Sequence, residues 1–255
     1  MKSSVGRHRE IVAMLHENGR IDVATVAQRF NITLETVRRD LVSLEHDGLV
    51  LRVHGGAVLG ERGLRLPHRV SVRSAEKDAI SRAAMAHIPT SGAILLDAGS
   101  TVGRLAEVWP GGLPILVVTN ALPAAITLVS KPDIVVHTLG GRVGPRTLDE
   151  VGTAALQALA QISVDVAFIG ADGMSVSHGF STSDHAQSST KRAMIGAAKK
   201  SVVLADSSKI GMDFFARVAT LREVDLVITD DGAPADAVEQ FRAAGIDVEI
   251  AVVGR

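Results

Sequence analysis

The feature that most constrains the fold is the alternation of short apolar runs with helical patterns from residue 93 onward. The apolar runs have the length of buried strands and cover residues 93–96, 115–118, 134–138, 164–169, 201–205, 226–229 and 248–252. Helical periodicity lies between most of them, at residues 102–108, 122–129, 153–161, 186–199 and 234–244. Strands that are apolar throughout are buried on both faces. The alternation therefore predicts an α/β domain with a mostly parallel sheet, preceded by a helix that Ser74 caps.

The first part of the chain shows a different pattern, in which short helices follow one another. Residues 9–18 have helical periodicity, and Gly19 ends that helix. Ile21 is expected to be a single extended residue. Asp22 is then expected to cap a second helix over residues 23–30.

A third helix follows a tight turn, with Thr33 as its cap and Gly48 at its end. Its apolar positions are spaced three and four apart, which predicts one buried face: Leu34, Val37, Leu41 and Leu44. Residues 49–53 then read as a strand, and residues 54–59 turn back beside it. Two short helices, a third helix and a hairpin predict a winged helix-turn-helix domain.

The exposed face of the third helix carries side chains suited to a DNA major groove. Beginning at the cap, these are Thr33, Glu35, Thr36, Arg38, Arg39 and Ser43. Thr36 and one of the two arginines can meet base edges while the other arginine meets a phosphate. In the hairpin, Arg52 and His54 can touch phosphate or the minor groove. A solvated surface helix is the alternative interpretation, because short charge clusters are common.

We expect three segments: a DNA-binding domain over residues 1–59, a linker over residues 60–73 and an effector domain over residues 74–255. The linker shows no clean periodicity and carries four arginines, at positions 62, 65, 69 and 73. A solvated connector is favoured over a segment that lies on DNA phosphates.

Composition narrows the class of protein. The chain has 255 residues, of which 46% are hydrophobic, so a sizeable core is available. It contains no cysteine, which excludes disulfides and thiolate chemistry, and its nine histidines show no metal-ligand pairing. The start of the chain has no apolar signal segment, and the apolar runs are too short to span a bilayer. A cytoplasmic protein without metal, cofactor or membrane contact is expected.

The carboxyl ends of five predicted strands carry unusual chemistry. The segments that follow the strands contain small residues, hydroxyls, amides, carboxylates and a lysine: Asp97-Ala98-Gly99-Ser100-Thr101, Thr119-Asn120, Gly140-Gly141-Arg142, Gly170-Ala171-Asp172-Gly173 and Asp206-Ser207-Ser208-Lys209. Ligands of open α/β sheets bind at this edge. Backbone N–H groups at a helix start suit a phosphate, and carboxylates suit hydroxyls. Any single glycine-rich loop is equally explained by a tight turn, and a lone aspartate by capping.

Both halves resemble the DeoR family of bacterial transcriptional regulators. The N-terminal resemblance lies in the run Thr33-x-x-Thr36-Val37-Arg38-Arg39-Asp40-Leu41-x-x-Leu44-Glu45-x-x-Gly48 and in Arg52-x-His54-Gly55-Gly56-Ala57. The C-terminal resemblance lies in the five strand-end segments, in Lys191-Arg192-Ala193-Met194-Ile195 and in Ile228-Thr229-Asp230. The chain departs from the family at residues 185–189, His-Ala-Gln-Ser-Ser, where family members often carry glutamates.

The resemblance implies a sensor domain similar to ribose-5-phosphate isomerase and to the CoA-transferase-like fold, which binds a phosphorylated sugar. It implies phosphate contacts from Gly99, Ser100, Thr101 and Lys191. It implies sugar contacts from Asp97, Asn120, Asp172 and Lys209. The same edge supplies Thr119, Gly140, Gly141, Gly173 and Asp206 as further candidate effector residues.

Three functions are compatible with these patterns. The first is a repressor of carbohydrate-metabolism genes that a sugar phosphate releases from a double-stranded DNA operator. The second is a sugar-phosphate isomerase, with Asp97, Asp172 and Lys191 as its acid–base groups. The third is a ligand-indifferent DNA-binding protein whose α/β half only forms the oligomer. The first is preferred, and a homodimer or homotetramer is expected because one winged domain contacts too few bases.

Overall fold

The computed structural model describes residues 4–18, 20–46, 49–53, 55–59 and 66–254. The chain divides into two compact units, Met1–Val72 and Arg73–Arg255.

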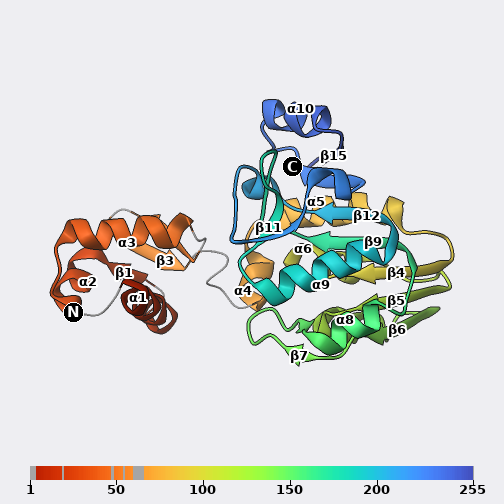
Figure 1. The fold of residues 1–255 in the computed structure, drawn as a ribbon, viewed down its shortest axis with the longest axis horizontal. Coiled ribbons are helices and arrows are strands. Elements are labelled where there is room, and N and C mark those ends of the chain that lie inside the picture. The colour runs from red at the N-terminus through yellow and green to blue at the C-terminus, as the bar shows by residue number, and fades with distance from the viewer. Residues whose placement is uncertain (1–3, 19, 47–48, 54, 60–65, 255) are drawn as a thin grey trace. The chain divides into compact units, whose positions relative to one another are not determined.

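The N-terminal unit is the predicted winged helix-turn-helix (Figure 1). Its elements in chain order are α1 (Ser4–Asn18), β1 (Arg20–Asp22), α2 (Val23–Phe30), α3 (Leu34–His46), β2 (Val50–Val53) and β3 (Gly56–Leu59). The three strands form an antiparallel sheet in the order β1-β3-β2. The helices bury Ile11, Leu15, Val26, Val37, Leu41 and Leu44 in one core with the sheet. Ile21 lies in β1 and joins this core, so the residue expected to be extended pairs with β3.

Some local details of this unit agree with the sequence predictions and others differ. Thr33 does cap α3, since its hydroxyl accepts the N–H of Thr36 at 3.1 Å. The side chain of Asp22 makes no capping hydrogen bond at the start of α2. Leu34 is 46% exposed rather than buried, because it is the first residue of the helix. Gly48, the predicted end of α3, lies outside the described residues.

The predicted linker contains a short helix, α4 (Leu66–Ser71), which the sequence pattern did not indicate. Helix α5 (Ser74–Ala84) follows it, and its N-cap is Arg73 rather than Ser74. Arg73 adopts a left-handed conformation with φ of 51°. The chain therefore makes a sharp turn where the C-terminal unit begins.

The C-terminal unit is built on a seven-stranded sheet in the order β15-β14-β12-β9-β4-β5-β6 (Figure 1). The strands are β4 (Gly92–Leu96), β5 (Ile115–Thr119), β6 (Ile134–Thr138), β9 (Val164–Gly170), β12 (Ala198–Leu204), β14 (Leu226–Asp230) and β15 (Asp247–Ala251). Each neighbouring pair is parallel. The predicted α/β class and parallel sheet are therefore confirmed, and all seven carboxyl ends lie at one edge.

Helices cover both faces of this sheet. Helices α5, α6 (Ser100–Val108) and α7 (Leu122–Leu128) pack on one face. Helices α8 (Thr153–Leu159), α9 (His185–Gly196) and α10 (Ala235–Ala243) pack on the other. The predicted continuation of α9 to residue 199 is wrong, since β12 begins at residue 198.

Two small antiparallel sheets were not predicted. One contains β10 (Gly173–Ser175), β11 (Gly179–Thr182) and β13 (Ala216–Ala219), in that order. The other pairs β7 (Arg142–Val143) with β8 (Glu150–Val151). These strands are short and rich in small or polar residues, so they lack the apolar pattern of the main strands.

Candidate effector site and DNA-recognition helix

The centre of the candidate effector site is a buried ion pair at the carboxyl edge of the sheet. Asp97 follows β4 and is 1% exposed. It accepts the N–H of Gly170 at 2.9 Å and a hydrogen bond from Lys191 Nζ. Lys191, on α9, also donates to the carbonyl of Gly170 at 3.0 Å. Burial raises the pKa of Asp97, and the Lys191 ammonium and the Gly170 N–H oppose that rise. The pair joins three elements, β4, β9 and α9.

The start of α6 lies directly after Asp97 and presents a helix N-terminus. Gly99 is its N-cap, with φ of 142°, and Ser100 and Thr101 are buried in the first turn. A β-carbon built at Gly99 would meet no atom within 4 Å. Ser81 of α5 donates to the carbonyl of Thr101 at 3.0 Å and holds this turn in place. Free space above unpaired helix N–H groups is the geometry that binds an anion.

The adjacent strand end supplies an unsatisfied polar atom. Asn120 follows β5, is 2% exposed, and its Oδ1 has no hydrogen-bond partner among the described residues. The hydroxyl of Thr119 donates to the carbonyl of Leu96 at 2.6 Å and accepts the N–H of Ala121 at 3.0 Å. Thr119 therefore binds two backbone groups, and Asn120 keeps an acceptor that a bound ligand can use.

The β7–β8 hairpin closes the next part of the edge. The N–H of Gly140 donates to Glu150 Oε2 at 2.8 Å. At Gly141, φ is 119° and a β-carbon would lie 2.7 Å from the carbonyl oxygen of Val151. Glycine is needed there so that the chain can approach β8.

A chain of polar side chains connects this hairpin with α9. Gln187 donates to Thr147 Oγ1 at 3.2 Å, and its Oε1 lies 3.3 Å from Thr182 Oγ1. The same Thr182 hydroxyl lies 2.6 Å from Asp172 Oδ2, and Thr147 donates to Asp149. Asp172 was predicted, whereas Thr147, Asp149 and Thr182 were not. No spacing in the sequence relates Thr147 and Asp149 to Thr182, because the first two lie in the β7–β8 loop and Thr182 lies at the end of β11.

Gly173, Asp206 and Lys209, the remaining predicted effector residues, are already in contact with other groups of the protein. Gly173 lies in β10, where a β-carbon would be 2.3 Å from the carbonyl oxygen of Met212. Asp206 is fully buried and pairs with Arg73 Nε at 3.1 Å and Lys209 Nζ at 3.9 Å. The guanidinium of Arg73 also lies 3.5 Å from Asp230, at the end of β14. Asp206 and Lys209 thus belong to an ion cluster around Arg73, which the sequence interpretation placed in the linker.

Lys77 is a further buried cation that the sequence interpretation missed. It is 2% exposed and lies one helical turn before Ser81 on α5. Because Ser81 contacts the first turn of α6, Lys77 belongs to the helix face that packs beside that turn. The signal in the sequence was a lysine inside an otherwise apolar stripe. A buried ammonium is retained only beside anionic or carbonyl partners.

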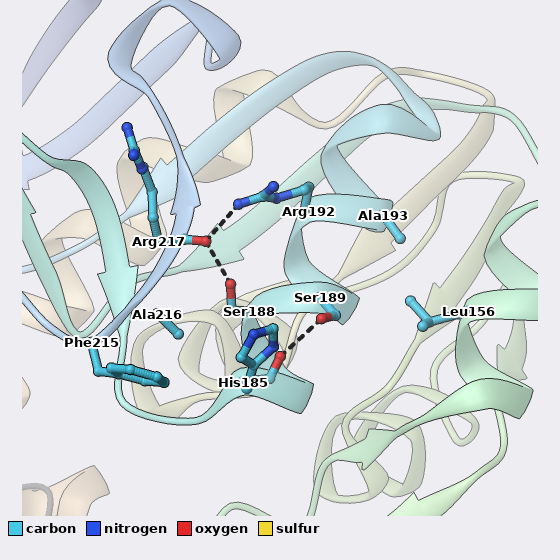
Figure 2. A pocket seen from close by; sticks show the side chains of 9 residues that line it. All are labelled: Leu156, His185, Ser188, Ser189, Arg192, Ala193, Phe215, Ala216 and Arg217. Carbon is cyan, nitrogen blue, oxygen red and sulfur yellow. Dashed lines mark hydrogen bonds between the residues drawn. The ribbon is translucent and has the colours of Figure 1, made fainter.

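A separate groove of about 570 Å³ lies on the outer side of α9 (Figure 2). It is lined by Leu156, His185, Ser188, Ser189, Arg192, Ala193, Phe215, Ala216 and Arg217. Ser188 and Arg192 both donate to the carbonyl of Arg217, at 2.6 and 2.8 Å. None of the predicted effector residues lines this groove.

In the N-terminal unit, α3 presents the predicted polar face. Thr33, Glu35, Arg38, Arg39 and Ser43 are exposed and Thr36 is half-buried. Glu35 lies 3.8 Å from Arg38, which is a loose pair with both side chains mostly in solvent. The arginine side chains of α3 are therefore exposed to solvent and accessible to DNA.

Two acidic residues organise this domain. Asp40 is buried and accepts from Arg7 Nε at 2.5 Å and from His8 at 3.1 Å, so it fastens α3 to α1. Burial opposes its ionisation, but the hydrogen bonds from Arg7 and His8 hold the pKa of Asp40 below its ordinary value. Glu45 accepts from Arg52 Nε at 2.6 Å, which ties β2 to α3. His54 lies outside the described residues.

Among the described residues, no three His, Asp or Glu side chains gather in a way that would hold a metal ion. Within the same part of the chain, no helix combines the length and hydropathy needed to cross a membrane.

A winged helix-turn-helix joined to an α/β domain with a polar carboxyl edge defines a DNA-binding transcriptional regulator with a sensor domain. Comparison with known families agrees. Residues 7–62 match the DeoR-like helix-turn-helix domain, and residues 72–231 match the DeoR C terminal sensor domain. The chain belongs to the DeoR family of transcriptional regulators, so the resemblance seen in the sequence is confirmed.

Individual relatives cover almost the whole chain. The HTH-type transcriptional regulator GolR of Listeria innocua is 31% identical, over 96% of this chain and 98% of that protein. The Glycerol-3-phosphate regulon repressor of Escherichia coli K12 is 28% identical, over 96% of this chain and 98% of that protein. The HTH-type transcriptional repressor GlcR of Bacillus subtilis is 33% identical, over 86% of each. These relatives are regulators, so the chain is a regulator rather than an isomerase.

Among solved structures, the sensor unit is similar to ribose 5-phosphate isomerase A from Neisseria gonorrhoeae. That similarity has 21% identity, a TM-score of 0.39 and 52% coverage of each chain.

Proposed function

We propose that this regulator represses carbohydrate-metabolism genes and leaves its operator when a phosphorylated sugar binds the carboxyl edge of the sensor sheet. The observation that carries the proposal is the buried, unpartnered Oδ1 of Asn120, one strand away from the Asp97–Lys191 pair. The names of two relatives from Escherichia coli point the same way: the "Glycerol-3-phosphate regulon repressor" and the "Putative aga operon transcriptional repressor".

Within this proposal, the phosphate binds at the start of α6. Gly99, Ser100 and Thr101 supply N–H groups and hydroxyls, and Lys191 and Lys77 supply positive charge. Asp97, Asn120 and Asp172 bind sugar hydroxyls. Thr119, Gly140, Gly141 and Gly173 shape the site, because their groups already bind or contact the backbone. Asp206 and Lys209 lie beside this site and influence it through the ion cluster around Arg73.

The DNA-binding domain, residues 1–59, reads the operator through α3. Arg39 and Thr36 contact base edges while Arg38 contacts a phosphate, or the two arginines exchange these roles. Thr33, Glu35 and Ser43 border this contact. In the wing, Arg52 and His54 contact the DNA backbone. Two copies are needed for two half-sites, so the protein acts in the cytoplasm as a homodimer or homotetramer.

The decisive experiment is a thermal-shift screen of the full-length protein against phosphorylated sugars and their unphosphorylated counterparts. A ligand at about 100 times its dissociation constant adds about 2.7 kcal/mol to the free energy of unfolding. We expect one phosphorylated sugar to raise the melting temperature. Asp97→Asn keeps the shape of the side chain and should weaken this ligand at least about ten-fold, or 1.4 kcal/mol.

The second arm measures operator binding at fixed salt concentration. Arg39→Ala should weaken DNA binding without changing the ligand-induced shift in melting temperature. Asp97→Asn should bind the operator normally and fail to release it. A blank ligand panel with intact DNA binding would instead favour the ligand-indifferent regulator. Normal effector release by a folded Asp97→Asn variant would show that the effector site is elsewhere.

A further inference from the structure

Two buried carboxylates beside the candidate effector site have no cation. Asp149 is 3% exposed and Glu150 is 7% exposed. Asp149 accepts a hydrogen bond from Thr147, and Glu150 accepts the N–H of Gly140 at 2.8 Å. Within the described part of the chain, neither carboxylate has an ion-pair partner. Because buried carboxylates are almost always paired with positive charge, this part of the sensor domain favours a ligand that brings such a charge.

Both acidic residues lie beside Asn120 at the end of β5. Glu150 donates its N–H to the carbonyl of Asn120 at 2.7 Å, and Asp149 forms a β-bridge with Ala121. The Oδ1 atom of Asn120 is buried and has no hydrogen-bond partner among the residues that the structure describes. An acceptor without a donor thus lies next to two acidic residues. The ligand group that binds here must therefore donate hydrogen bonds.

The charge of Asp149 also acts on the Asp97–Lys191 pair. Burial is the main cause that raises the pKa of Asp97, and the negative charge of Asp149 raises it further. Lys191 opposes this rise, but its ammonium already binds Asp97 and the carbonyl of Gly170. Lys191 therefore compensates Asp97 and leaves Asp149 without a cation.

Open space borders Asn120 on both sides. Gly99 follows the neighbouring strand β4, and Gly140 follows β6 on the other side. A β-carbon built at either glycine would meet no atom within 4 Å. Neighbouring strands are about 4.8 Å apart. A ligand group held at Asn120 is therefore within the length of one sugar phosphate from the start of α6.

The cation that fits this place is an organic ammonium rather than a metal ion. In the described chain, no three acidic or histidine side chains are arranged to hold a metal ion. An ammonium carries a positive charge and several N–H donors, which suit a carboxylate and an amide oxygen together. A hydroxyl offers one donor and no charge, so it would leave the buried carboxylates uncompensated.

We propose that the effector is a phosphorylated amino sugar, whose ammonium binds Asp149 and Asn120 while its phosphate binds the start of α6. This inference rests on the proposed function and narrows it, because an ammonium takes the place of one sugar hydroxyl. Asp149 is then the residue that determines specificity for the amine.

The first test compares matched sugar phosphates by isothermal titration calorimetry of the full-length protein. Glucosamine 6-phosphate is paired with glucose 6-phosphate, and galactosamine 6-phosphate with galactose 6-phosphate. The members of each pair differ only in an amine that replaces one hydroxyl. In the pair that binds more tightly, the amine member should have at least about ten-fold higher affinity, as expected for a hydrogen bond between charged groups. This advantage should decrease as the pH rises through the pKa of the sugar ammonium.

The second test uses Asp149→Asn, which keeps an acceptor for Thr147 and removes the charge. The two members of the pair should then bind within about three-fold of each other. Affinity for the hydroxyl member should not fall. Asp247→Asn is the matched control, because Asp247 is exposed at the amino end of β15, on the opposite edge of the sheet. This control should keep the full advantage of the amine. The melting temperature of ligand-free Asp149→Asn should not fall, since a buried carboxylate without a cation does not stabilise the fold.

Equal binding of both members of each pair by the wild-type protein would overturn this inference and leave the proposed function standing. An amine advantage that survives in folded Asp149→Asn would overturn the assignment of the ammonium to Asp149. If no phosphorylated sugar binds, the proposed function fails and the inference that rests on it fails too.

Discussion

At the scale of single residues, the carboxylate of Asp40 on α3 has a structural role. It directly follows two exposed arginines, Arg38 and Arg39, in sequence, yet it points inward to Arg7 and His8. Asp40→Asn keeps the volume and removes the charge. We expect the free energy of unfolding of the N-terminal domain to fall by about 1.5–3 kcal/mol at pH 7, which is typical of hydrogen bonds to a charged group.

The effect of Asp40→Asn should depend on pH with a definite sign. The pKa of Asp40 is lower in the folded protein than in the unfolded chain, so its contribution is complete above the unfolded value of about 3.9. That contribution disappears as the pH falls through the folded pKa. Thermal melting from pH 7 to pH 3 should therefore show the wild-type and Asp40→Asn curves converging in acid. Asp22→Asn is the control, since Asp22 caps nothing and its loss should cost under about 0.5 kcal/mol. A difference that stays constant with pH would contradict the assignment.

At the scale of elements, the β7–β8 hairpin is held to α9 by the amide of Gln187. Thr147 uses its proton on Asp149, so only a donor at position 187 can bind its oxygen. Gln187→Glu removes that donor and adds a negative charge near Asp149 and Asp172. We expect the loop between the strands to open more often and an anionic effector to bind about 5- to 50-fold more weakly, corresponding to roughly 1–2.3 kcal/mol.

Limited proteolysis can measure this opening without knowledge of the effector. Arg146 is exposed in the loop and is a site for trypsin. Gln187→Glu and the uncharged Gln187→Met should both be cleaved after residue 146 faster than the wild type. Only Gln187→Glu should also carry the charge penalty on effector binding. Equal cleavage rates in all three proteins would show that Gln187 does not hold the hairpin.

The main elements were predictable because their patterns are local. Strands such as β6 and helices such as α2 follow from apolar runs and from spacings of three and four. The small sheets were not predictable, since β10 and β11 are stabilised by packing against residues more than thirty positions away, such as Met212. The capping predictions failed in part: Asp22 is the N-cap of α2 as expected but its side chain makes no capping hydrogen bond, and the N-cap of α5 is Arg73 rather than Ser74. A capping residue type does not show whether its side chain will reach the helix N–H groups.

The candidate site was predictable in outline and not in its contacts. Parallel strands bring their carboxyl ends together, so Asp97, Asn120 and Asp172 could be placed at one edge. The pairing of Asp97 with Lys191 joins residues 94 positions apart and appears only in the fold. Arg73 was interpreted as linker because its partners, Asp206 and Asp230, are distant in sequence.

At the scale of the whole molecule, Arg73 is where the chain enters the sensor domain. Its guanidinium donates to Ser207 Oγ at 2.9 Å and pairs with Asp206 and Asp230, at the ends of β12 and β14. Those ends lie along the same sheet edge as the proposed effector site. A ligand that changes the contacts of Asp206 or Lys209 therefore acts directly on the first residue after the DNA-binding unit.

This arrangement predicts that Arg73→Met uncouples the two domains. Effector binding, measured by thermal shift, and operator binding without effector should both stay within about two-fold of wild type. The decrease in operator affinity caused by effector should shrink from the roughly 5- to 150-fold of typical allosteric coupling towards none. Arg82→Met, a change at an exposed arginine on the same helix, should respond to effector normally. A full response from Arg73→Met would exclude Arg73 as the coupling residue, whereas lost effector binding would place Arg73 in the site itself.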